Sequence, residues 1–222
     1  MSKVEVFEDL NINDFLKAGR AKIGSNDGYT EIEEDGTLRF DGAAVVWDDI
    51  RIVPGVFDFP GIADPVLDNW QPGGAGATYK VWVFAQNDEV HTTVQLPHKY
   101  KEGSDIYAHV HWTPRTRGNE EIGKTVAWKI DVSWSNNGEV FPSSTTYDLT
   151  DTCTGTDNLH EKTSDVLLSG VDKRISSMLE IRLYRDATDD WAGVLAAQLP
   201  AFLELDFHFQ IDTAGSRESH SK

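Results

Sequence analysis

"KTVAWKIDVSW", residues 124–134, is the stretch that decides the fold. Its apolar side chains occupy every second position from Val126 to Trp134, and small or polar residues lie between them. Successive side chains of a β-strand point to opposite faces of the sheet, so this alternation predicts a strand with one buried and one polar face. The same pattern recurs from Leu203 to Ile211 in "AFLELDFHFQID", residues 201–212.

Further strand candidates follow at short spacing along most of the chain. They are "AVVWDDIRIV" (44–53), "TYKVWVFA" (78–85), "EVHTTVQLP" (89–97), "DIYAHVHWTP" (105–114), "STTYDL" (144–149), "SDVLLSG" (164–170) and "SSMLEIRLYRD" (176–186). Many short strands with one apolar face are typical of antiparallel sheets packed face to face. The sequence therefore predicts an all-β protein, an antiparallel β-sandwich of the jelly-roll kind.

The ends of the chain differ from its middle. We interpret residues 1–40 as an irregular N-terminal arm or small subdomain, with a short helix at "NINDFLKAG" (11–19). "KIGSNDGYTEIEEDGTLRF" (22–40) then reads as a turn, a short strand, an Asp-Gly turn and another short strand. The sandwich is expected to span residues 41–213, and a polar tail residues 214–222.

Composition limits the partners. The 222 residues include 37 acidic and 20 basic ones, a formal charge of −17. Such a surface repels phosphate backbones and anionic lipid, so we expect neither nucleic acid nor a membrane as partner. The single cysteine, Cys153, fits folding in a reducing cytoplasm, and the N-terminal "MSKVEVFEDL" lacks the basic and apolar regions of a signal peptide.

Two histidines in "GSDIYAHVHW", residues 103–112, invite a metal-site interpretation. The spacing of His109 and His111 after a glycine resembles the start of the cupin metal motif. Strand alternation, however, places both on the polar face of their strand, and cupins carry a glutamate where this chain has Arg115 and Thr116. The later cupin motif is absent as well.

A metal requires a third or fourth ligand beyond such a pair. His91 and His208 also occupy polar strand positions, so a cluster is conceivable, but the sequence alone favours no bound metal and no cofactor. "RDATDD" (185–190) lacks the spacing and glycine of an EF-hand loop. There is no nucleophile elbow and no cysteine–histidine signature, so we expect no enzymatic activity.

Tryptophans offer another binding chemistry. Trp112, Trp128 and Trp134 fall on apolar strand faces and are expected in the core. Trp70 and Trp191 occur in loop-like contexts and are the expected exposed pair. Exposed indole rings serve either subunit contacts or sugar stacking.

Four blocks of the chain resemble a group of tailed-bacteriophage virion structural proteins. The blocks are "GTLRFDGAAVVWDDIR" (36–51), "VQLPHKYKEGSDIYAHVHW" (94–112), "ISSMLEIRLYRDATDD" (175–190) and "LELDFHFQIDTAGSRE" (203–218). The resemblance implies a particle component with a jelly-roll or sandwich body, either a capsid cement (decoration) protein or the base of a head or tail fibre. It carries over no catalytic residues.

The leading hypothesis is a non-enzymatic cement protein on the exterior of a phage head, made in the host cytoplasm. It would bridge major capsid proteins and form a homotrimer. The arm, the Pro/Gly-rich connection 54–77 and the pair Trp47 and Arg51 are the expected contact elements. His109 and His111 are expected at a subunit contact that protonation would weaken below roughly pH 6. The alternatives are a fibre or adhesin module that binds host surface carbohydrate, and a cupin-like metalloprotein.

Overall fold

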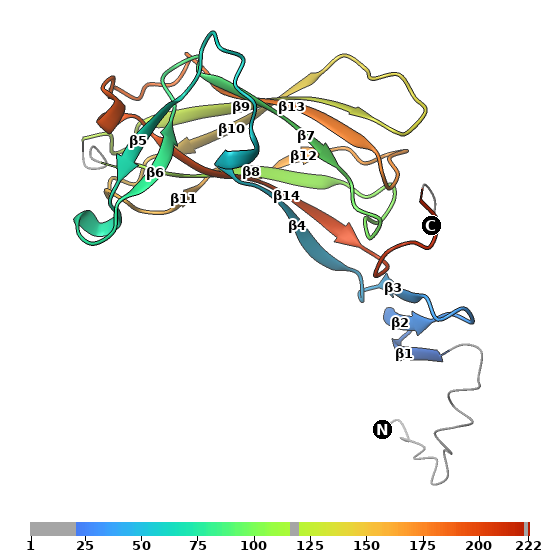
Figure 1. Cartoon of the computed structure of the whole chain (residues 1–222). Helices are drawn as coiled ribbons and strands as arrows, with labels where there is room; N and C mark the ends of the chain where they lie inside the picture. Colours follow the sequence, from blue (N-terminus) through green and yellow to red (C-terminus); the bar gives the residue numbers. More distant parts are fainter. Residues whose placement is uncertain (1–20, 116–119, 220–221) are drawn as a thin grey trace.

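The computed structural model describes residues 21–115, 120–219 and 222, and these fold into antiparallel sheets (Figure 1). Two sheets pack face to face. The smaller one has the order β10 (Thr145–Thr152), β9 (Thr125–Ser135), β13 (Met178–Arg185) and β7 (Glu89–Gln95). The predicted antiparallel β-sandwich is therefore confirmed.

The larger sheet has β8 and β14 at its centre. Its order is β11 (Glu161–Lys162), β8 (Ile106–Thr113), β14 (Ala201–Ile211), β6 (Tyr79–Val83) and β5 (Val66–Trp70), with β12 (Val166–Leu168) beside β8 and β4 (Val46–Ile52) beside β14. Short 3-10 turns lie at Pro54–Val56, Pro72–Gly74 and Ala196–Gln198. Within the described residues, no helix is long and apolar enough to cross a membrane.

The core lies between these two sheets and is rich in aromatic rings. Trp112 and Trp128 are fully buried and Trp134 is 6 % exposed, as the alternation predicted. The ring of Phe84 meets that of Trp128 edge-on, with centroids 4.9 Å apart. Such offset aromatic pairs add to the free energy gained by burying their area. Among the described residues, the buried members of the main core cluster begin at Ile52, so residues 21–45 contribute none of them.

Two local features differ from the predicted pattern. A β-bulge between Phe202 and Glu204 shifts the register of β14 against β8. An extra residue in one strand reverses the side-chain alternation, so Phe202 enters the core in place of Leu203. The connection 54–77, expected to be irregular, contains strand β5, which pairs with β6 despite the surrounding prolines.

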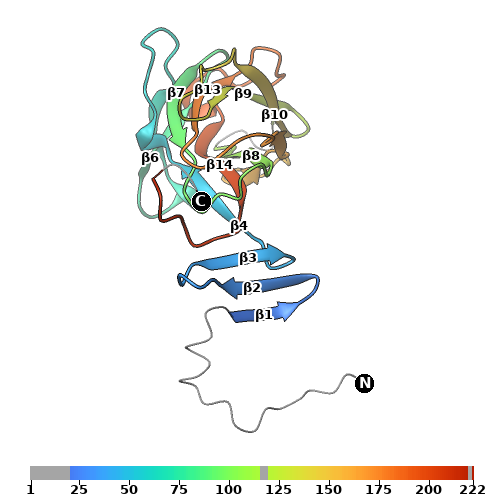
Figure 2. The same ribbon diagram turned by 90° about the vertical axis from the view of Figure 1, so that its right-hand side faces the viewer.

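A separate three-stranded sheet, which we call the arm sheet, projects from one end of the sandwich (Figures 1 and 2). It consists of β1 (Ala21–Ser25), β2 (Gly28–Ile32) and β3 (Leu38–Gly42). β1 was not predicted as a strand. The helix predicted at 11–19 lies outside the described residues.

Few contacts join the arm sheet to the sandwich. The backbone N–H of Phe40 donates to the carbonyl of Asp212 at 2.7 Å, and Arg39 forms an isolated bridge with Thr213. In the C-terminal segment, the Arg217 guanidinium donates to the carbonyl of Asp35. The segment after β14 therefore braces the arm sheet, although the sequence suggested only a polar tail there.

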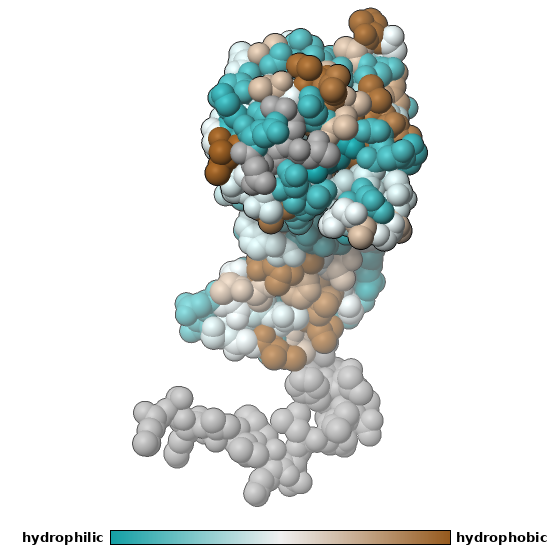
Figure 3. All heavy atoms as spheres, turned by 90° about the vertical axis from the view of Figure 1, so that its left-hand side faces the viewer, coloured by the Kyte–Doolittle hydropathy of each residue, from teal (hydrophilic) through white to brown (hydrophobic). Residues whose placement is uncertain are grey.

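The arm sheet has one apolar face. Register pairs Ile23 with Thr30 and Thr30 with Phe40, and it pairs Ile32 with Leu38, so these side chains share one side of the sheet. Ile23 is 66 % exposed and Ile32 is 43 % exposed, and apolar residues gather visibly on the arm in Figure 3. This face is not covered by the described part of the chain.

A candidate histidine–carboxylate site

Three adjacent strands bring histidines and carboxylates together on the face of the larger sheet that points away from the core. β14 lies between β8 and β4, and its register places Asp206 opposite His109 on one side. On the other side, His208 lies opposite Asp49. Ile106, Ala108, Val110 and Trp112 are buried in the core, so the alternate residues of β8 must point to the opposite face. We call His109, His111, Asp206, Asp49 and His208 the histidine–carboxylate cluster.

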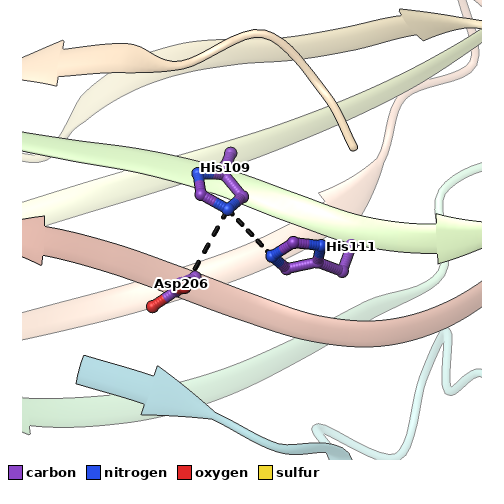
Figure 4. A group of neighbouring side chains, drawn as sticks. All are labelled: His109, His111 and Asp206. Atoms are coloured by element: carbon purple, nitrogen blue, oxygen red, sulfur yellow. Dashed lines mark hydrogen bonds and ion pairs between the residues drawn. The ribbon is translucent and has the colours of Figure 1, made fainter. Parts of the chain in front are cut away.

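The centre of this cluster is formed by His109, His111 and Asp206 (Figure 4). The two Nε2 atoms of the histidines are 2.9 Å apart. Asp206 Oδ2 lies 3.9 Å from His109 Nε2. One ligand atom of each of the three residues lies within 4.8 Å of those of the others, a spacing that is compatible with a shared metal ion.

A second trio shares the same carboxylate. Asp206 Oδ2 lies 4.0 Å from His208 Nε2, and Nδ1 of that ring pairs with Oδ1 of Asp49. The rings of His109 and His208 have centroids 4.7 Å apart. Asp206 is therefore the residue on which both groups converge.

Supporting residues reach the outer nitrogens of the central histidines. Nδ1 of His111 lies 2.7 Å from Nε2 of His160, which precedes β11. Asp165 Oδ1 lies 3.0 Å from His109 Nδ1, although the contact lacks hydrogen-bond geometry. Arg51 and Glu204 close one side with a bidentate pair, at 2.9 and 2.7 Å.

Burial is the main cause of the pKa shifts in the cluster. His109 is 2 % exposed, and its desolvation, together with Lys162 and the neighbouring histidines, lowers its pKa to about 4. Desolvation and His160 lower the pKa of His111. The pKa of Asp206 is raised, first by its own burial and then by Asp49. The central histidines are thus neutral at pH 7, which leaves a lone pair on each ring for a hydrogen bond or a metal.

An open groove gives access to the cluster. It has a volume of about 570 Å³, and its lining includes His111, His160, Asp206 and Trp70. Of the two central histidines, His111 therefore faces the groove.

The structure brings some of the histidines that the sequence singled out together and keeps His91 apart from them. His109 and His111 lie together as expected, but His109 is enclosed by its own chain, so only His111 of the two reaches the surface. A cupin arrangement does not apply, since the histidines point away from the core. His91 is on β7 in the other sheet, where it pairs with Glu89. The role of these histidines at a subunit contact stays a prediction.

Trp47 and Arg51 both lie on β4, the strand that borders the cluster. Trp47 is 52 % exposed and meets Tyr107 edge-on, at 5.6 Å between centroids. Arg51 is engaged by Glu204. Their role as contact anchors stays a prediction.

The predicted exposure of two other tryptophans needs correction. Trp191 is 5 % exposed and packs edge-on against Trp112, because its loop folds back over the core. Trp70 is half-buried, and its Nε1–H donates to Asn158 at 2.8 Å. The exposed indole on a strand is Trp47 instead.

Sequence reasoning missed Asp206, Asp49, His160 and Asp165 as members of this site. Asp206 was visible only as a polar position in an alternating strand, whereas His208 was already a conceivable cluster member and does lie beside His109. The polar residues of "RDATDD" are already engaged: Asp189 pairs with Arg185, and Asp190 accepts from Thr125.

No protein-family model and no curated protein matches the chain. Among solved structures, it is similar to the CBM22-2 xylan-binding domain from Paenibacillus barcinonensis Xyn10C, with a TM-score of 0.38, 7 % identity, and 75 % of this chain and 99 % of that chain covered. It is also similar to VP2 in the subviral particle of infectious bursal disease virus, with a TM-score of 0.36 and 7 % identity. The similarity covers 85 % of this chain and 40 % of that chain.

A third similar structure is a Paenibacillus sp. cycloisomaltooligosaccharide glucanotransferase, with a TM-score of 0.41, 14 % identity and 70 % of this chain covered. The chain spans only 18 % of the length of that enzyme. All three TM-scores are below 0.5, so these likenesses assign neither an activity nor a ligand to the chain.

Proposed function

We propose that this protein is a non-enzymatic structural subunit of a virus particle, a cement protein that docks on the exterior of the capsid and bridges major capsid proteins. The observation that carries the proposal is the apolar face of the arm sheet, which no described residue of the chain covers. The resemblance of four sequence blocks to tailed-phage virion proteins supplies the kind of particle.

A sheet that is hydrophobic on one face must bury that face against another element. The arm sheet buries little against its own sandwich, yet it presents Ile23, Ile32, Leu38 and Phe40 on one face. The main core cluster, as far as the chain is described, includes no residue of the arm sheet. A sheet arranged in this way is suited to packing on a neighbouring subunit.

The predicted contact segment 54–77 also exposes large apolar side chains. Val56 is 57 % exposed, Ile62 94 % and Val66 51 %. Soluble monomers rarely present many large apolar side chains together, and such surfaces mark contacts with partners. Two weak contact surfaces per copy, repeated over a shell, provide avidity without requiring a strong single site.

The test measures binding of the full-length protein to capsid shells that have been stripped of it. We expect the wild-type chain to cosediment with the shells, and Ile23→Ser/Ile32→Ser to lose most of this binding. A matched control is Val140→Ser/Val194→Ser, which removes two apolar side chains that are 92 % and 80 % exposed on loops of the sandwich. Equal binding of both double variants would contradict the proposal.

Copy number on the virion decides the location. A cement protein is expected in hundreds of copies over the head, by cryo-electron microscopy or quantitative mass spectrometry of purified particles. Six, twelve or eighteen copies at the tail would instead indicate a fibre or tail component.

One observation favours the carbohydrate-binding alternative. A groove of about 340 Å³ is lined by Trp47 and Tyr107, with Glu102, Asp105 and Gln210 among its polar groups. Exposed aromatic rings beside carboxylate and amide groups suit sugar recognition. Under this alternative, Trp47→Ala abolishes retention on host surface polysaccharide and leaves shell binding unchanged.

A further inference from the structure

The carboxylate of Asp206 is poorly satisfied for a buried charge. The residue is 5 % exposed, and its Oδ1 atom has no hydrogen-bond partner among the residues that the structure describes. Its Oδ2 atom lies 3.9 Å from His109 Nε2 and 4.0 Å from His208 Nε2, both beyond hydrogen-bond distance. Buried charges in proteins are normally paired at close range or coordinate a metal.

The nitrogen atoms that face this carboxylate are suitably placed. His109 Nε2 and His111 Nε2 are 2.9 Å apart, and the carboxylate oxygen is 3.9 Å from the first of them. A tetrahedral zinc ion with ligands at about 2.0–2.1 Å separates its ligand atoms by about 3.3 Å. The two distances bracket this value, and the three ligand atoms all lie within 4.8 Å of one another, so the three side chains are close enough to share one ion.

The outer nitrogen of each ring lies close to a polar group, although only the contact of His111 has hydrogen-bond geometry. His111 Nδ1 lies 2.7 Å from His160 Nε2, and His109 Nδ1 lies 3.0 Å from Asp165 Oδ1. Ligating histidines commonly direct their second nitrogen to a carboxylate or another acceptor, which orients the ring. The two cations near the cluster are already engaged, because Lys162 pairs with Asp165 and Arg51 with Glu204. Neither needs to be displaced by an incoming ion.

We propose that His109, His111 and Asp206 bind one divalent transition-metal ion of the zinc type. Two imidazole nitrogens and one carboxylate oxygen favour such an ion over calcium or magnesium, which prefer oxygen ligands. The fourth position opens on the groove lined by His111 and His160, where water is available. The ion ties β8 to β14 at the centre of the larger sheet. This inference is independent of the proposed capsid role.

The test uses the full-length protein, freed of metal by dialysis against a chelator and then titrated with Zn²⁺ and Co²⁺. We expect one equivalent per chain by elemental analysis after desalting, and visible Co²⁺ absorption bands of a four-coordinate nitrogen–oxygen site. His111→Ala and Asp206→Asn are each expected to weaken binding by roughly 100-fold or more, since loss of a merely supporting residue already costs 10–100-fold.

The control is His91→Ala, which removes an exposed histidine of the other sheet that lies 3.3 Å from Glu89. It is expected to retain full binding, which separates the site from adventitious binding to the acidic surface. Circular dichroism of each metal-free variant establishes folding, and Asp206→Asn keeps the volume of the side chain. Absence of stoichiometric binding in the wild type would overturn the proposal, as would equal affinity in the wild type and a folded Asp206→Asn variant.

Discussion

Acidification is expected to destabilise the metal-free protein through His109. This ring is 2 % exposed, and its burial, assisted by Lys162 and the neighbouring histidines, lowers its pKa from 6.5 to about 4. The unfolded chain therefore takes up a proton at a higher pH than the folded chain does. The stability due to neutral His109 is fully present above pH 6.5 and is lost as the pH falls toward 4.

The magnitude follows from the size of this shift. One pKa unit corresponds to about 1.4 kcal/mol, so the full loss is about 3 kcal/mol. Between about pH 7 and pH 4.5 the expected loss is about 2 kcal/mol. For a chain of this length, that corresponds to a decrease in Tm of roughly 4–8 °C.

Urea denaturation of the wild type and of His109→Asn is measured in the presence of a chelator and across this pH range. The difference between the two pH profiles separates the protonation of His109 from the titration of the carboxylates. The variant is expected to be less stable than the wild type at pH 7. Its free energy of unfolding should, however, fall by about 2 kcal/mol less than that of the wild type between about pH 7 and pH 4.5. His91→Ala should keep the wild-type slope. A His109 pKa near 6 in an NMR titration, or parallel pH profiles of the wild type and His109→Asn, would refute the reasoning.

Three other perturbations test the fold. Asp189→Ala leaves the buried guanidinium of Arg185 without its bidentate partner, at 2.6 and 2.9 Å. The free energy of unfolding, measured by urea denaturation, is expected to fall by about 3–5 kcal/mol. A decrease below about 1 kcal/mol would contradict this pairing. Gly170→Ala places a methyl group onto the carbonyl oxygen of Ser104 and should lower Tm markedly, whereas Gly55→Ala, at a glycine without a positive φ, adds a methyl group with no described atom within 4 Å. Removal of residues 1–43 should abolish shell binding and leave the Tm of the sandwich, measured by calorimetry, within a few degrees of the full-length value. Global unfolding of the truncated chain would contradict a core that is independent of the arm sheet.

Much of the sandwich was predictable from the sequence. The alternation from Val126 to Trp134 is a property of one strand, and all five apolar residues in it are buried. The same reasoning correctly placed Trp112 in the core and the two histidines of β8 on the opposite face. It failed at Phe202, where a bulge reverses the alternation, and at Trp191, where a loop returns to cover the core.

The composition of the candidate site was less accessible. His109 and His111 were visible as a pair, because the i, i+2 spacing of a strand places them on the same face. The depth at which His109 is enclosed was not visible, since it depends on Asp165 and His208 packing around the ring from other strands.

The sequence by itself determined the fold class, the core face of most strands and the pairing of His109 with His111, because side-chain alternation is encoded within each strand. Only the tertiary structure decided that Asp206 lies opposite His109 and that His208 lies opposite Asp49. Cross-strand register joins segments far apart in the chain, and a shift of one residue would turn each of these side chains to the other face. For the same reason, the apolar face of the arm sheet became visible only when the register aligned Ile32 with Leu38.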